Sequence, residues 1–158
     1  MTPTLRRQLH SAATLQLLEP QFRSRLVPVA VLQPAQDCAQ LWRRIVFNIL
    51  ISNTDDHLRN HGFLLHPSGW RLAPAYDMNP IATADGLCLN ISETDNALSL
   101  ELAEEVSSHF RVKPNRAKKI IEEVAAQVRG WRKIAKSLRM PTRETDRMAN
   151  AFRMAENA

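Results

Sequence analysis

An apolar stripe that runs directly into a polar cluster constrains this chain more than any other feature of its sequence. Residues 41–50 carry apolar side chains at the spacing of one broad helix face, namely Leu41, Trp42, Ile45, Val46, Ile49 and Leu50. The stripe predicts a buried helix. Asp37, with Gln40 three residues later, fits a capping box and predicts where that helix begins. The helix would deliver the chain to Ser52, where polar residues take over.

The polar cluster NTDDHLRN is too hydrophilic to continue a buried helix, so we expect a loop over residues 53–60. Two short strands should follow, over residues 62–65 and 70–72, because a His-Pro-Ser-Gly turn separates them. Pro74 should end the second strand, since proline has no N–H for a ladder hydrogen bond. This hairpin would carry the chain back to the loop.

Metal-binding and proton-handling side chains are concentrated in the loop and just after the hairpin. They are Asn53, Asp55, Asp56, His57, Asn60, His61 and Asp77. Mg²⁺ prefers oxygen ligands and usually takes one or two protein carboxylates beside phosphate oxygens and water. The Asp77 carboxylate and the Asn60 amide oxygen suit that ion. Asp55 is then left to orient a hydroxyl group and accept its proton.

The order Asp55, Asn60, hairpin, Asp77 resembles the catalytic loop and metal-binding segment of protein kinases. More specifically, ISNTDDHLRNHGFLL and WRLAPAYDMNP resemble the C-terminal domain of HipA-type toxin kinases, as do SAATL and LWRRIVFNIL further upstream. The resemblance covers most of the chain. It implies that Asp55 is the catalytic base and that Asn60 and Asp77 bind Mg²⁺ and, with it, ATP. No Gly follows Asp77, so the hinge of the usual kinase motif is not expected here.

The resemblance also implies a domain organisation. We expect a mainly α (α+β) fold, a protein-kinase-like helical C-lobe with a small β-hairpin at the catalytic loop. One domain would span residues 1–158, with a leading segment (1–36), the catalytic helix, loop and hairpin (37–80) and a helical remainder (81–158). No Gly-rich phosphate loop and no Lys–Glu pair can be identified upstream of Asp55. We therefore expect the N-lobe to be absent and this chain alone to lack turnover.

The leading segment and the stretch after the hairpin give weaker patterns. Residues 2–20 predict a short amphipathic helix, and residues 21–36 predict a connecting loop. Leu87–Ile91 alternates between apolar and other residues, which predicts a short strand.

The C-terminal half predicts helices. Ser99 should cap the first of them, and Pro114 should stand in the first turn of the next. Apolar spacing continues past Gly130, so that helix is expected to run through the glycine. A last helix should follow, capped by Thr142.

Several residues around the site have structural interpretations. Asp56 would pair with Arg59 or Arg44, and the side-chain amide of Asn53 would tie the loop together. Tyr76 would either shape the site or pack in the core, and the sequence does not decide between them.

His57 and His61 stand four residues apart, a spacing that could bind zinc on a helix. The segment reads as loop and lacks the H-E-x-x-H pattern. Hydrogen-bonding loop histidines are therefore favoured over a zinc site.

The charge distribution is uneven along the chain. The formal net charge is +5, but the part from Arg111 to the end carries 13 Lys and Arg against 5 Asp and Glu. Such a basic third favours an anionic partner surface, nucleic acid included, although a solvated helical face is the simpler interpretation.

No run approaches about 20 apolar residues, so no membrane span is expected. Cys38 and Cys88 predict free thiols in a cytoplasmic protein.

The resemblance implies a toxin–antitoxin setting. The expected partners are a HipB-like DNA-binding antitoxin, a missing N-terminal kinase half and a protein substrate, for which an aminoacyl-tRNA synthetase is the candidate. Two other functions fit the residues. One is a non-catalytic remnant lobe that binds an antitoxin or partner subunit. The other is a metal-dependent phosphohydrolase built on Asp55, Asp56, His57, His61 and Asp77.

Overall fold

A computed structural model describes residues 34–67, 69–83 and 86–158 of the chain. The described part is mainly helical and contains one two-stranded antiparallel sheet, which confirms the predicted mainly α (α+β) class. The helix expected over residues 2–20 and the greater part of the connecting loop lie outside the described residues.

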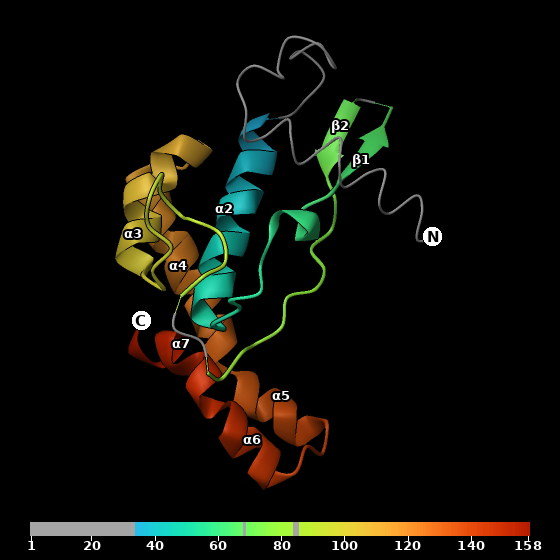
Figure 1. Cartoon of the computed structure of the whole chain (residues 1–158), viewed down its shortest axis with the longest axis vertical. Helices are drawn as coiled ribbons and strands as arrows, with labels where there is room; N and C mark the ends of the chain where they lie inside the picture. The colour runs from blue at the N-terminus through green and yellow to red at the C-terminus, as the bar shows by residue number, and fades with distance from the viewer. Residues whose placement is uncertain (1–33, 68, 84–85) are drawn as a thin grey trace.

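Helix α2 (Pro34–Leu50) is the element around which the other elements are arranged. Figure 1 shows it through the middle of the molecule, with α3 and α4 on one side and the hairpin on the other. Four residues of its predicted apolar stripe, Trp42, Val46, Ile49 and Leu50, expose no surface, while Leu41 and Ile45 are half-buried. The Trp42 indole also donates a hydrogen bond from Nε1 to the main-chain oxygen of Ala103, 2.8 Å away. Burial of this stripe explains why a long helix forms here.

The predicted start of this helix is wrong. Helix α2 is already formed at Pro34, so Asp37 lies in its first turn and is not its cap. Proline is well tolerated in the first turn because the N–H it lacks would have no helical partner. The Asp37 carboxylate instead accepts hydrogen bonds from Nε of Arg71 at 3.1 and 3.2 Å. This pair ties the hairpin to α2.

The predicted hairpin is confirmed. Strand β1 (Phe63–His66) pairs with β2 (Gly69–Leu72) in a register that runs from Phe63 opposite Leu72 to His66 opposite Gly69. Gly69 has φ of 114°, a conformation that a side chain would disfavour. One more main-chain bond, from the N–H of Ala73 to the oxygen of Gly62 at 2.8 Å, closes the open end of the hairpin.

The strand predicted at Leu87–Ile91 is wrong, because this segment forms a series of bends. Its alternation is real, since Leu87 and Ile91 are buried in the core. The main-chain N–H groups of these two residues bond to the oxygens of Asn96 and Asp95, at 2.9 and 2.7 Å. The segment folds back on itself. Among the described residues no strand lies beside it to form a ladder, and a ladder is what a strand requires.

The remaining elements are short helices around one longer one. They are α3 (Leu100–Glu105), η4 (Val106–Phe110), α4 (Pro114–Arg129), α5 (Trp131–Ser137), α6 (Thr142–Met148), η5 (Ala149–Phe152) and α7 (Arg153–Asn157). Ser99 caps α3 as predicted, because its hydroxyl accepts a hydrogen bond from the N–H of Leu102 at 3.0 Å. Pro114 opens α4, also as predicted.

Two predictions about the C-terminal helices are wrong. Gly130 separates α4 from α5, because its N–H bonds to the oxygen of Gln127 and so tightens the last turn of α4. Thr142 is the first residue of α6 and not its cap; Pro141 precedes it, and no side chain caps this helix. Sequence spacing alone could not detect the break, since apolar residues continue on both sides of Gly130.

Among the C-terminal helices, α7 packs against α2 and α4, and α5 packs against α4. Trp131 stacks on Phe152 with ring centroids 4.2 Å apart and an interplanar angle of 13°. Arg129 donates from Nη1 to the main-chain oxygen of Ala158 at 2.8 Å.

Among the described residues no helix is both long and apolar enough to cross a bilayer. Cys38 and Cys88 are not joined in a disulfide.

Candidate functional site

The polar loop begins where α2 ends, and it is anchored at that point. Ser52 is fully buried and has φ of 51°, which turns the chain away from the helix axis. The N–H of Asn53 bonds to the main-chain oxygen of Asn48 at 2.8 Å. From the C-terminal helix, Arg153 donates from Nη1 to Oγ of Ser52 at 3.1 Å. The base of the loop is thus fixed to α2 and α7 before the first candidate site residue.

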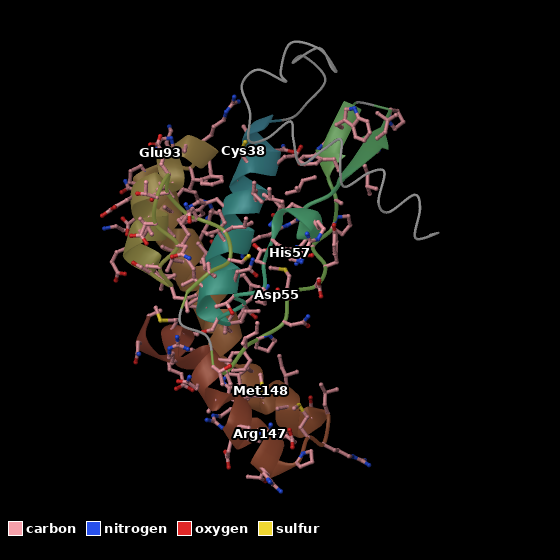
Figure 2. The ribbon with its side chains drawn as sticks, viewed as in Figure 1. Cys38, Asp55, His57, Glu93, Arg147 and Met148 are labelled. Atoms are coloured by element: carbon pink, nitrogen blue, oxygen red, sulfur yellow. The ribbon has the colours of Figure 1, made fainter. Side chains whose placement is uncertain are left out.

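Asp55 and Asn60 occupy the two sides of this loop. Asp55 is exposed, whereas Asn60 is buried at the end of the 3₁₀ turn η3 (Leu58–Asn60). Asn60 donates from Nδ2 to the main-chain oxygen of Asp55 at 3.4 Å. Within the described part of the chain, nothing donates a hydrogen bond to the amide oxygen of Asn60. The Asn60 amide oxygen and the exposed Asp55 carboxylate could therefore bind a ligand or accept a proton. In the view of Figure 2, Asp55 and His57 lie between α2 and the segment that follows the hairpin.

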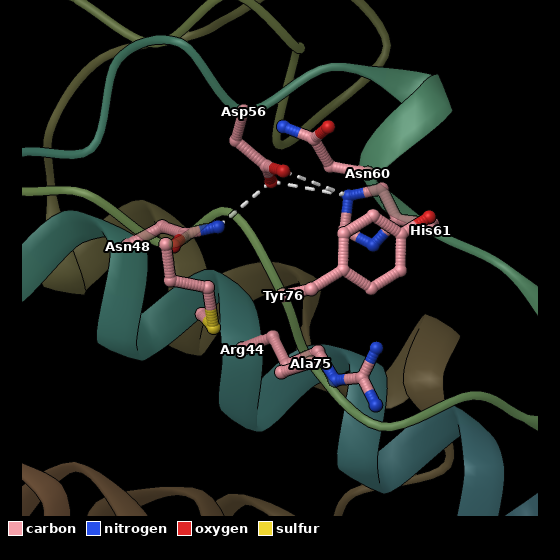
Figure 3. A pocket seen from close by; sticks show the side chains of 8 residues that line it. Arg44, Asn48, Asp56, Asn60, His61, Ala75 and Tyr76 are labelled. Carbon is pink, nitrogen blue, oxygen red and sulfur yellow. Dashed lines mark hydrogen bonds and ion pairs between the residues drawn. The ribbon is translucent and has the colours of Figure 1, made fainter. Parts of the chain in front are cut away.

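The segment after the hairpin returns to the loop, as the sequence led us to expect. The Tyr76 hydroxyl donates to the main-chain oxygen of Arg59 at 2.8 Å. Tyr76 and Met78 also line a small polar cavity together with Asn60 (Figure 3). The cavity measures about 10 Å³, close to the space that one water molecule needs. Asp77 stands between these two cavity residues and is exposed.

Asp77 has an unusual backbone conformation. Its φ is 59°, in the left-handed region that most side chains avoid but that Asp and Asn tolerate best after glycine. Its carboxylate oxygen Oδ1 accepts a hydrogen bond from Nδ2 of Asn79 at 3.1 Å. The left-handed turn is therefore made by the aspartate itself, and Met78, not glycine, follows it. Unfavourable backbone geometry of this kind is often retained at functional sites.

The left-handed backbone at Asp77 leads to a prediction about stability that does not depend on the function of the protein. We expect Asp77→Val to lower the free energy of unfolding by about 1–2 kcal/mol, because a β-branched residue fits the left-handed region poorly. Asp77→Asn should be neutral, and Asp77→Gly should be neutral or stabilising. Urea unfolding of the three variants measures the order. A Val variant as stable as wild type would show that the backbone at Asp77 is not left-handed.

Asp56, next to Asp55, points the other way. It is buried, and its Oδ2 accepts a hydrogen bond from Nδ2 of Asn48 at 2.7 Å. Its two carboxylate oxygens also lie 3.0 and 3.1 Å from Nε2 of His61. The sequence interpretation paired Asp56 with Arg59 or Arg44, whereas its hydrogen bonds go to Asn48 and His61. Asn53 does tie the loop down, by donating from Nδ2 to Oδ1 of Asn48 at 3.1 Å.

Arg44 is a buried cation close to the site. Its Nη2 donates to the main-chain oxygen of Ala73, while its Nε and Nη1 have no acceptor in the described part of the protein. Burial lowers the pKa of the Arg44 guanidinium, an effect opposed by Tyr76, Asp56 and Asp37. Arg44 lines the same small cavity as Tyr76 and Asn60, so it adds positive charge behind the loop.

The two loop histidines have different surroundings. His61 is buried against Asp56, while His57 is half-buried, and its shielded Nδ1 finds no hydrogen-bond partner among the described residues. Among residues 34–67, 69–83 and 86–158, no three or more His, Cys, Asp or Glu side chains lie together in a way that could hold a metal ion. The two Mg²⁺ ligands expected from the sequence are Asp77 and Asn60. Only Asp77 belongs to these four residue types, because the ligand atom of Asn60 is an amide oxygen.

A second, larger cavity lies behind the loop. It measures about 300 Å³, the lower end of the range for small-molecule pockets. Its walls are Cys38, Leu41, Ile45, Leu58, Leu87, Leu89, Asn90, Ile91, His109 and Phe110, with Asn48, Asp56 and His61. Those last three side chains also line the small polar cavity. They therefore form part of the wall of both spaces.

Sequence reasoning missed the role of Asn48. A signal was present, because Asn48 is a polar residue between Phe47 and Ile49 near the end of a buried helix. Such a residue must find partners inside the protein, and its partners are the loop residues Asp56 and Asn53. The partner itself could not be predicted, since it depends on how the loop folds back over α2.

The fold and the site together define a mainly helical domain whose central helix presents an acid-and-amide loop beside a β-hairpin. The family model of the HipA-like C-terminal domain matches residues 5–132, and the chain belongs to this family. The family is kinase-related and associated with toxin–antitoxin proteins. The match ends within α5, so α6, η5 and α7 lie beyond it. No curated protein and no solved structure matches the chain.

Proposed function

We propose that this chain is the catalytic-loop lobe of a HipA-like serine/threonine protein kinase of a toxin–antitoxin system, which transfers the γ-phosphoryl group of ATP to a protein hydroxyl. The observation that carries the proposal is the return of the segment 75–78 to the loop 55–60. Tyr76 bonds to that loop, and the residues on both sides of Asp77 share a cavity with Asn60. Membership of the family adds independent support.

The donor atoms of the site fit Mg²⁺. The Asn60 amide oxygen receives no hydrogen bond from any described residue, and the Asp77 carboxylate is exposed. Both are hard oxygen ligands of the kind that Mg²⁺ takes when it is bound together with phosphate. When bound, the ion would neutralise charge on the phosphate oxygens.

The remaining steps fall to the side chains of the chain itself. Asp55 would hold the acceptor hydroxyl and take its proton as the new phosphate ester bond forms. Asn60 is already oriented by its bond to the main chain of Asp55, so the base and the ligand are held as one unit. Positioning and charge neutralisation, more than covalent chemistry, drive phosphoryl transfer.

Binding of ATP with and without Mg²⁺ tests this proposal. Equilibrium dialysis should show Mg²⁺-dependent binding that weakens at least about tenfold in Asp77→Asn and in Asn60→Leu, since each variant removes one metal ligand. Asp95→Asn, a change of the same kind on an exposed turn, is the matched control. Binding that ignores Mg²⁺, or that both site variants retain in full, would contradict the assignment.

A non-catalytic lobe is the second candidate, and it is favoured by the exposure of Asp55 and Asp77, neither of which lines the two cavities described above. In that case the chain would bind an antitoxin or partner subunit without nucleotide. The partners that the resemblance implies, a HipB-like antitoxin and an aminoacyl-tRNA synthetase substrate, belong to this proposal and not to the observations. So do a cytoplasmic location and a nucleic-acid contact by the basic part of the chain after Arg111.

A further inference from the structure

Two adjacent carboxylates in the loop have opposite environments. Asp55 is exposed, and Asp56 is 8% exposed. A buried carboxylate is costly unless hydrogen bonds compensate for lost water. Asp56 has that compensation from Asn48 at 2.7 Å and from His61 at 3.0 Å (Figure 3). Because both of its oxygens are engaged, Asp56 is poorly placed to serve as a metal ligand or base.

Asp56 and His61 stand next to the candidate catalytic residues in the chain. Asp56 directly follows Asp55, and His61 directly follows Asn60. The Asp56–His61 contact therefore joins the two ends of the span that carries the candidate base and the candidate ligand. A second link across the same span runs from the Asn60 amide to the main-chain oxygen of Asp55.

The joined loop is in turn attached to the central helix α2. Asn48 lies on α2, is 2% exposed and bonds to Asp56. The Asn48 side chain is also held by Asn53, which donates from Nδ2 to Oδ1 of Asn48. The oxygen of Asn48 is thus occupied, which leaves its NH₂ group directed at Asp56. The orientation of the loop is set from the helix through these amides.

We infer that Asp56, held by Asn48 and His61, is a positioning residue that fixes the directions of Asp55 and Asn60. The inference rests on the proposed function for its catalytic meaning. Groups that orient metal ligands through hydrogen bonds typically change affinity by about 10- to 100-fold when removed. The same residues line both cavities behind the loop, so loss of the pair would open the loop on its buried side.

Four variants and two measurements test this inference. Asp56→Asn weakens the pair, and His61→Phe removes the ring donor. His61→Gln restores a donor, and Asp146→Asn changes a distant exposed carboxylate paired with Arg132 at 3.7 Å. Mg²⁺-dependent ATP affinity is measured by equilibrium dialysis. Amide hydrogen exchange is followed over residues 55–61 and over α4, with the full chain held well below its unfolding transition.

We expect Asp56→Asn and His61→Phe to weaken ATP affinity about 10- to 100-fold. Exchange should accelerate in residues 55–61 and stay unchanged in α4. His61→Gln should recover most of the affinity, which a merely space-filling role would not explain. Full affinity and normal loop exchange in Asp56→Asn and His61→Phe would overturn the inference. If wild type itself binds no ATP, the proposed function fails, and loop exchange alone decides whether Asp56 fixes the loop.

Discussion

Asp55→Asn should reduce phosphoryl transfer to a protein hydroxyl by about 10²- to 10⁴-fold, the contribution that a positioned general base usually makes. Asparagine has the size of aspartate but cannot accept the proton of the acceptor hydroxyl. The link from Asn60 goes to the main-chain oxygen of Asp55, which the substitution leaves in place. The affinity for Mg²⁺ and ATP should therefore change little. Initial rates of transfer from radiolabelled ATP measure the effect.

Rates should be compared for the chain by itself and mixed with the product of any adjacent reading frame. Asp146→Asn, on the exposed surface of α6, should retain the wild-type rate. Turnover that survives Asp55→Asn would remove Asp55 from the mechanism. Robust turnover that is lost in Asp55→Asn would support the site.

Trp42→Ala should lower the free energy of unfolding by about 3–5 kcal/mol, the usual cost of truncating a large buried aromatic residue. Trp42 exposes no surface and lies in the core cluster between α2, α3 and α4. Its removal also leaves the Ala103 oxygen without its indole partner in a buried position. Small domains are stable by only about 5–15 kcal/mol, so the variant should be close to unfolding. Urea denaturation followed by circular dichroism measures the loss.

Two further variants separate the causes of that loss. Trp42→Phe keeps most of the apolar volume and removes the hydrogen bond, so it should cost about 1–3 kcal/mol. Trp70→Ala truncates the same residue type on the hairpin, where the side chain is only half-buried, and should cost less than Trp42→Ala. Equal losses at Trp42 and Trp70 would show that α2 is not the centre of the core.

The elements that could be predicted from the sequence are those determined by local patterns. The apolar spacing of residues 41–50 predicts a helix, and the His-Pro-Ser-Gly turn predicts a hairpin; both are observed. Ser99 and Pro114 specify helix starts through their own chemistry. In each case the information lies within a few residues of the structure that it determines.

The errors arise where distant partners decide the structure. Asp37 was expected to cap a helix, but Arg71, 34 residues later in the chain, takes its carboxylate. Leu87–Ile91 has the alternation of a strand, but no strand lies beside it in the part of the chain that the structure describes. Asp56 was expected beside an arginine, whereas Asn48 and His61 hold it. These outcomes depend on how separate elements of the fold pack against one another, which no local pattern records.

For the candidate site, too, the sequence indicated the residues, and the structure was needed to show how they are held. Residues Asp55, Asn60 and Asp77 were selected by type, order and resemblance, and the structure adds the contacts of the segments that carry them. The left-handed conformation of Asp77 and the link from Asn48 to the loop were beyond sequence reasoning. Both concern how the site is held, which spacing along the chain does not reveal.

Paramagnetic broadening by Mn²⁺ in the presence of ATP tests the central claim most directly, because Mn²⁺ takes the same oxygen ligands as Mg²⁺. In amide spectra of the full chain, substoichiometric Mn²⁺ with ATP should broaden the signals of Asp55, Asp77 and the Asn60 side-chain amide together. The signals of α4 should stay sharp. Broadening confined to other acidic surfaces, or reaching only one of the three residues, would show that they do not share a site and would contradict the kinase-lobe account.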